Sequence, residues 1–193
     1  MQHKLATKIV AFFSHRRLIE KNNEEWCVYF IETRIFSYIA FLLIFFILLP
    51  FANPGRMIIL LLFVLLIRRR SGGYHCKTEQ RCFLLSLLVV ALGLIQASLL
   101  EEKYAAQLLI LILSSCAIFT GPVNQPELHL SREEFCENAN RLRKMTVLLT
   151  CVALIMISMR VSVASYCVTG LFIAGVSIVA GKFIQVWRKI QCS

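Results

Sequence analysis

The side chains in this sequence best suited to chemistry lie between residues 68 and 82. The segment is Arg-Arg-Arg-Ser-Gly-Gly-Tyr-His-Cys-Lys-Thr-Glu-Gln-Arg-Cys and combines a histidine, two cysteines and five cations. A thiol attacks as its thiolate, a form that neighbouring cations such as Lys77 and Arg81 favour. His75 is able to take the proton of Cys82 and later give it to a leaving amine, as in a Cys-His nucleophilic pair. The composition is compatible with a site in which Cys82 is the nucleophile and His75 its base.

The spacing of these two residues restricts the backbone between them. Seven residues of continuous helix rise about 10.5 Å, whereas a nucleophile and its base must approach to roughly 3 Å. The chain must therefore fold back between His75 and Cys82, or the pair must form across two subunits. Gly72 and Gly73 adopt backbone angles that are closed to other residues. We expect a non-helical or re-entrant segment near residues 70–82.

Other interpretations of this segment remain open from the residues alone. The cations are also typical of a cytoplasmic anchor, in which the thiol of Cys82 is incidental. A metal site built from His75, Cys76 and Cys82 lacks a fourth ligand and the paired spacing of zinc sites, so we expect no metal or other cofactor. Glu79, one helical turn from the histidine, either orients His75 or forms a solvated salt bridge with a neighbouring cation.

The composition places the segment in a membrane protein. Of 193 residues, 58% are hydrophobic and 17% are charged, with a mean hydropathy of +0.71, more apolar content than a soluble domain of this size could bury. We predict a single all-α membrane domain over residues 1–193, with cytoplasmic or interfacial helices over 1–34. The six apolar stretches predicted to span the membrane are 35–52, 54–67, 83–100, 104–121, 145–159 and 161–181.

The distribution of charge predicts the orientation of these spans. Of the 21 Lys and Arg residues, only Arg56, Lys103 and Arg160 fall in the three connections assigned to the outside. Cytoplasmic loops retain Lys and Arg preferentially, so both termini and residues 68–82 are predicted to face the cytoplasm. The sequence contains no Asp and no HExxH motif, which excludes an aspartyl or zinc intramembrane protease.

Three further patterns suggest interactions. Leu5, Ile9, Phe12 and Phe13 recur at helical spacing among Lys4, Lys8, Arg16 and Arg17, as in a helix on an anionic lipid surface, although an ordinary packed helix fits equally. Ser131 and Glu134 form a capping box that predicts a helix running through Arg141 and Lys144 into the fifth span. Gly170 and Ala174 form a small-xxx-small pair, which permits helix approach and dimerisation.

The run from Arg70 to His75, followed by Cys82 after a basic cluster, resembles the accessory gene regulator B (AgrB) family. Gly121-Pro122-Val123 is similar to the proline-containing segment after the fourth span of that family. Residues Tyr29 to Glu32 are similar to its Tyr-Gly-x-Glu run. Phe30 replaces the glycine, so no role is assigned to Glu32.

This resemblance implies a membrane cysteine endopeptidase of Gram-positive quorum sensing, with Cys82 and His75 as catalytic residues. Its substrate would be an AgrD-like precursor peptide with an amphipathic leader and an acidic C-terminal tail. Cleavage through a thioester on Cys82 would lead to a cyclic thiolactone or lactone, and the family favours a homodimer. Gly72, Gly73, Arg70 and Glu79 would support the turn.

The net charge of +10 suits an acidic peptide, and no nucleic-acid partner is expected. The candidate substrate-binding cations are Arg68, Arg69, Lys77, Arg81, Arg141, Arg143 and Lys144, all of which also serve to set topology. The alternative function is a non-catalytic membrane transporter or peptide-export scaffold. The predicted spans contain few polar residues, which argues against transport.

Overall fold

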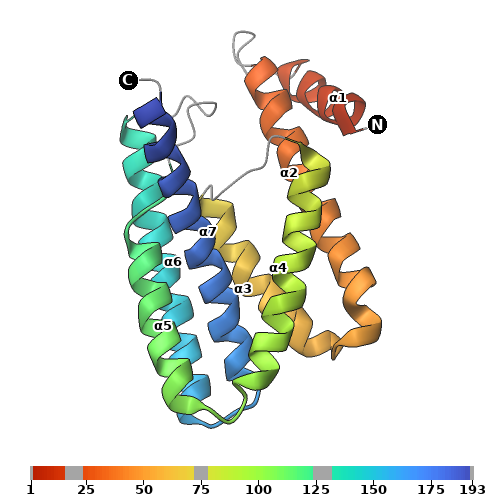
Figure 1. Cartoon of the computed structure of the whole chain (residues 1–193). Helices are drawn as coiled ribbons and strands as arrows, with labels where there is room; N and C mark the ends of the chain where they lie inside the picture. Colours follow the sequence, from red (N-terminus) through yellow and green to blue (C-terminus); the bar gives the residue numbers. More distant parts are fainter. Residues whose placement is uncertain (1, 16–23, 72–77, 124–131, 192–193) are drawn as a thin grey trace. The chain divides into compact units, whose positions relative to one another are not determined.

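The computed structural model describes residues 2–15, 24–71, 78–123 and 132–191 (Figure 1). These residues form seven α-helices and a short 3-10 helix, with no strand within the described ranges, so the predicted all-α class is confirmed. The elements are α1 (Gln2–His15), α2 (Glu24–Leu48), η2 (Leu49–Phe51), α3 (Pro54–Ser71), α4 (Glu79–Leu99), α5 (Tyr104–Phe119), α6 (Arg132–Ser158) and α7 (Ala164–Gln191).

Helices α2 to α7 correspond one by one to the six predicted apolar stretches. Three segments are long and apolar enough to cross a bilayer, namely Arg34–Phe51, Gln80–Leu99 and Ala164–Trp187, and Tyr104–Phe119 is a shorter apolar helix. Helix α3 ends in three consecutive arginines, and the first half of α6 is charged. Length and composition therefore identify three candidate spans in the described chain, fewer than the six predicted.

The surface of α4 is that of a helix in lipid. Leu84, Leu88, Leu92, Ile95 and Leu99 are each more than half exposed, at spacings of three and four residues that place them on one face of the helix. A continuous apolar stripe of this kind is unfavourable in water. The chain is therefore a membrane protein, as its composition predicts.

Residues Met1–Ile47, comprising α1 and nearly all of α2, form one compact unit. In α1, Ala6 and Val10 are buried, whereas Phe12 and Phe13 are 54% and 40% exposed. The two aromatic rings pack edge to face, with centroids 5.6 Å apart. This exposed pair is consistent with the predicted interfacial helix.

The second unit, Leu48–Ser193, is built around α7. Helix α7 packs against α3, α4, α5 and α6, and residues 164–171 are buried without interruption. Leu142, Ala164, Val168, Leu171 and Ile178 belong to the core and are fully buried. The position of α3 and α4 on this unit therefore depends on their packing against a shared central helix.

The small-residue pair of α7 lies inside this unit, where it is covered by the same chain. A Cβ atom on Gly170 would lie 2.7 Å from the Cβ of Phe63 and 3.0 Å from the carbonyl oxygen of Leu60, both in α3. Ala174 is 2% exposed. The predicted close helix approach is present, and it joins α7 to α3 of the same chain, so this pair is not available for contact with a second copy.

We expect Gly170→Ala to destabilise the protein by about 1–3 kcal/mol, since the added methyl meets a backbone oxygen and a Cβ atom that is fixed to the backbone and cannot turn away. Gly93→Ala is the matched control. Its Cβ would meet chiefly the terminal Cδ1 of Ile173, at 2.6 Å, which can adopt another rotamer. Thermal unfolding in detergent should show a lower midpoint for Gly170→Ala than for Gly93→Ala, and equal midpoints would contradict the close α3–α7 contact.

A polar cluster joins α3, α7 and the α4–α5 connection where α3 and α7 begin. Nη1 of Arg56 lies 2.5 Å from Oε1 of Glu101, and the hydroxyl of Tyr166 donates to the same oxygen at 3.1 Å. The side chains of Arg56 and Glu101 are 35% and 24% exposed, so the ion pair contributes little stability by itself. Its effect is to fix the relative positions of three helix ends.

Candidate active site

Cys82 lies in the first turn of α4. Thr78 precedes the helix in an extended conformation, with φ −128° and ψ 144°, and the Cys82 N–H donates to the Thr78 carbonyl at 3.1 Å. The thiol is half-buried and free. The first turn of a helix carries partial positive charge, which favours a negative charge on a side chain located there.

Arg68, in the last turn of α3, faces this thiol. Its Nη2 lies 3.9 Å from the sulfur of Cys82, and its Nη1 lies 3.4 Å from the hydroxyl oxygen of Ser86. Cys82 and Ser86 are one helical turn apart, so the two arms of the guanidinium contact successive turns of α4. A guanidinium in this position can stabilise a thiolate or the oxygen of a tetrahedral intermediate.

From sequence, Arg68 is placed among the substrate-binding cations and Ser86 is not included among the site residues. The structure instead brings Arg68 to the sulfur of Cys82, and Ser86 contacts the same guanidinium. The spacing of Ser86 from Cys82 is informative, because residues four apart lie on the same face of a helix. It could have predicted that Ser86 lies near the site. The direction of the Arg68 side chain depends on how α3 packs beside α4, which the sequence pattern does not give.

The end of α3 is held by residues that are distant in sequence. The amide Nδ2 of Asn138 in α6 donates to the carbonyl of Arg70 at 2.8 Å, and the N–H of Val123 donates to the carbonyl of Ser71 at 2.8 Å. Arg70 thus contributes to the site through its backbone. No local pattern singles out Asn138, which is 68 residues from Arg70.

The Gly121-Pro122-Val123 segment connects the end of α5 to the end of α3. Gly121 has φ +94°, a left-handed conformation that favours glycine. Lys182 of α7 donates to the carbonyl of Thr120 at 2.6 Å, which satisfies the end of α5. The segment that resembles the family motif is therefore fixed at both ends and lies against the end of α3 at Ser71.

Apart from Lys77, the other predicted substrate-binding cations lie in three described elements. Arg69, Arg81, Arg143 and Lys144 are exposed on α3, α4 and α6. Arg141 is exposed and paired with Glu137 one turn earlier. Helix α6 runs continuously through Arg141 and Lys144 into its apolar half, as predicted, while Ser131 of the expected capping box lies outside the described residues.

Several predicted site residues are not described. Gly72, Gly73, His75, Cys76 and Lys77 lie outside the described residues, as does the side chain of Glu79. The extended Thr78 interrupts any continuous helix between positions 75 and 82, as the spacing requires. The expectation of non-helical geometry over 70–82 is corrected at its two ends, because residues 70–71 end α3 and residues 79–82 begin α4.

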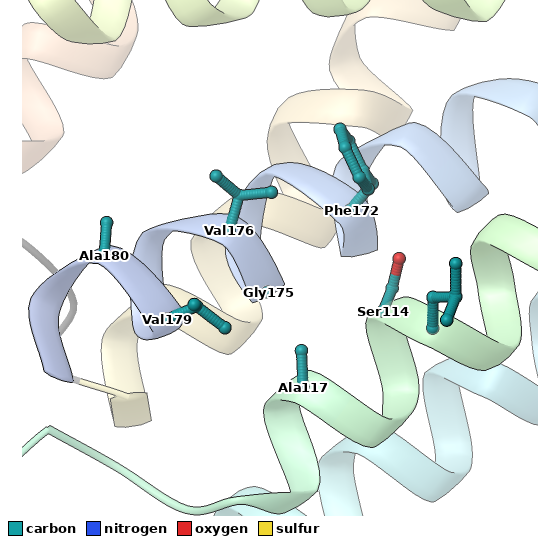
Figure 2. Close-up of a pocket in the computed structure, with 8 residues that line it drawn as sticks. Ser114, Ala117, Phe172, Gly175, Val176, Val179 and Ala180 are labelled. Carbon is teal, nitrogen blue, oxygen red and sulfur yellow. The ribbon is translucent and has the colours of Figure 1, made fainter. Parts of the chain in front are cut away.

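An apolar groove of about 290 Å³ lies between α5 and α7, away from Cys82. Figure 2 shows its lining, which includes Ser114 and Ala117 of α5 and Phe172, Gly175 and Val176 of α7. The hydroxyl of Ser114 donates to the carbonyl of Ile110 at 2.6 Å and is thus satisfied within its helix. The groove offers no side chain suited to acid, base or nucleophilic catalysis.

The fold and the site define an all-helical membrane protein with a cation-paired cysteine at a helix start. The chain matches the family described as AgrB, accessory gene regulator B, over residues 6–186 and belongs to that family. This membership supports a role in accessory gene regulator peptide processing and implies interaction with an AgrD-like precursor peptide. Searches of curated proteins and of solved structures found no match.

Proposed function

We propose that this protein is a cysteine endopeptidase that removes the C-terminal tail of a quorum-sensing precursor peptide, with Cys82 as nucleophile and His75 as its base. The observation that carries the proposal is the position of Cys82 in the first turn of α4, with the Arg68 guanidinium 3.9 Å from its sulfur. Of the six described cysteines, Cys82 combines a helix start with a contacting cation. Both features place positive charge beside the atoms on which negative charge develops during attack on a carbonyl.

In the first step, the Cys82 thiolate attacks the carbonyl carbon at the end of the future signal. A sulfur–carbon bond forms and the carbon–nitrogen bond to the tail breaks, while the tail amine leaves with the proton that His75 took from the thiol. Arg68 stabilises the sulfur before attack and the oxyanion during it. The product is a thioester between the shortened peptide and Cys82.

In the second step, a thiol or hydroxyl of the bound peptide attacks this thioester. The attacking group gives its proton to His75, the new ring bond is that of a thiolactone or a lactone, and the bond between the acyl carbon and the Cys82 sulfur breaks, which regenerates the Cys82 thiolate. A thioester and a thiolactone are close in energy, so the exchange requires mainly that water be kept away from the carbonyl. A position at the membrane surface favours this exclusion.

The remaining parts of the proposal concern the surroundings of the thiol. The protein lies in the cell membrane of a Gram-positive bacterium, with six spans, both termini in the cytoplasm and the active site at the cytoplasmic face. Arg69, Lys77, Arg81, Arg141, Arg143 and Lys144 attract the acidic tail of the precursor. The leader of the precursor and α1 share an anionic lipid surface. His75 reaches Cys82 within one chain or from the second subunit of a homodimer.

The proposal is tested by trapping the acyl-enzyme. The full-length protein is reconstituted in vesicles with a synthetic AgrD-like precursor, and intact protein is analysed by mass spectrometry after rapid acid quench. We expect an adduct equal to the tail-less peptide acid less one water, located on the Cys82 peptide and removed by hydroxylamine. An adduct on another cysteine would overturn the proposed mechanism. So would cleavage that leaves no adduct both with the unmodified precursor and with a precursor that cannot cyclise.

A further inference from the structure

Asn138 of α6 is a half-buried polar residue that the proposed reaction does not use directly. Its amide donates to the carbonyl of Arg70 at 2.8 Å, across a separation of 68 residues. The contact therefore records a specific meeting of α6 with the end of α3, two residues after the arginine that faces Cys82.

The last carbonyls of a helix have no partner within the helix and must be satisfied from outside. At the end of α3 this is done by two different elements, Asn138 from α6 and the backbone of Val123 from the α5–α6 connection. Ser71 is 1% exposed and Val123 is 6% exposed. The final turn of α3 is thus fixed by hydrogen bonds in a setting that largely excludes water.

Arg68 lies in this same final turn. Its guanidinium reaches Cys82 and Ser86 over a long, rotatable side chain, so a small rotation or shift of the turn changes the distance to sulfur. Helix α3 packs more extensively against α6 and α7 than against α4. The position of Arg68 relative to Cys82 is consequently determined by contacts made on the far side of α3.

We propose that Asn138 is a positioning residue for the cysteine site, which holds the end of α3 so that Arg68 stays in contact with Cys82. This inference rests on the proposed function for its biological meaning, but its geometry concerns the thiol alone. It predicts that the reactivity of Cys82 depends on Asn138 only as long as Arg68 is present. A residue that merely stabilised the fold would show no such dependence.

The test measures alkylation of the intact protein by iodoacetamide at pH 7, in detergent, without any precursor. Peptide mass spectrometry gives the rate at Cys82 and at Cys136, an exposed thiol of α6, which reports whether that helix stays intact. The variants are Asn138→Ala, Asn138→Leu, Arg68→Ala and the double variant Asn138→Ala with Arg68→Ala. Asn140→Ala, the same change at an exposed position of α6, is the matched control.

We expect Asn138→Ala and Asn138→Leu to slow alkylation of Cys82 about threefold to tenfold, with Cys136 and the Asn140→Ala control at wild-type rates. Leucine keeps the volume but lacks the donor, so a wild-type rate in Asn138→Leu would overturn the inference. In the Arg68→Ala background, loss of Asn138 should change the rate by less than about twofold, because Asn138 acts on the thiol through Arg68 and coupled residues are not additive. A full additional loss there would assign Asn138 a general structural role and overturn the inference.

The result separates this inference from the proposed function. Alkylation requires no peptide, so the expected pattern can hold in a protein that fails to form the acyl-enzyme. In that case the endopeptidase mechanism is lost and the positioning role remains. If the acyl-enzyme forms while Asn138→Leu reacts at the wild-type rate, the reverse conclusion follows.

Discussion

Replacing Cys82 with alanine is expected to reduce precursor cleavage by at least about 10³-fold, since the reaction loses its nucleophile. His75→Ala should lower cleavage by about 10²- to 10⁴-fold, the usual contribution of a general acid-base group. The measurement is release of the C-terminal tail from a synthetic AgrD-like precursor by protein in vesicles, followed by chromatography. Thermal unfolding of each variant establishes that the loss is chemical.

The matched control is Cys136→Ala, which removes another free thiol, exposed on α6. It should retain wild-type cleavage within about twofold, because surface substitutions away from a site change little. Cleavage that persists in Cys82→Ala would remove the endopeptidase mechanism proposed above. Equal losses in Cys82→Ala and Cys136→Ala would assign the effect to the fold and contradict the special role of Cys82.

The helices could be predicted because their signals are local. Each of α2 to α7 contains a continuous apolar stretch. Short polar or proline-containing segments separate these stretches, and Pro54, for example, marks the start of α3. The family resemblance likewise rests on a short run of residues, and the match over residues 6–186 confirms it. Local sequence was sufficient for the fold class, the membrane character and the family.

Long-range contacts were beyond the reach of such patterns. Gly170 and Ala174 show the spacing of a dimerisation motif, but whether α3 of the same chain or a second copy fills that face depends on packing. Arg68 and Arg69 are neighbouring residues of the same type, so the sequence does not distinguish them. The rotation of α3 about its axis directs Arg68 to Cys82. Asn138 has no local signal because its partner is a backbone carbonyl, which every residue possesses.

The number of spans illustrates a different limit. The predicted second and fifth stretches are apolar, but α3 continues into Arg68–Arg70 and α6 begins with a long charged half. Periodicity identifies a helix whether its charged end lies in water or snorkels to the surface. Composition therefore predicts the helices more securely than it predicts which of them cross the bilayer.

The second large effect is expected at Arg68. Arg68→Ala should lower precursor cleavage about 10²-fold, because the variant loses the charge that stabilises both the sulfur before attack and the oxyanion in the transition state. Arg68→Lys should recover part of the activity, since lysine keeps the charge but cannot contact Cys82 and Ser86 together. The measurement is the rate of tail release at saturating and at low precursor, which separates kcat from KM.

The control removes a cation from the opposite end of the second unit. Lys103 is exposed in the α4–α5 connection, next to the Arg56–Glu101 cluster, and Lys103→Ala should leave cleavage within about twofold of wild type. If Arg68 only bound the acidic tail, Arg68→Ala would raise KM and leave kcat unchanged. The contact with Cys82 instead predicts that most of the loss appears in kcat, and a loss confined to KM would return Arg68 to the set of substrate-binding cations.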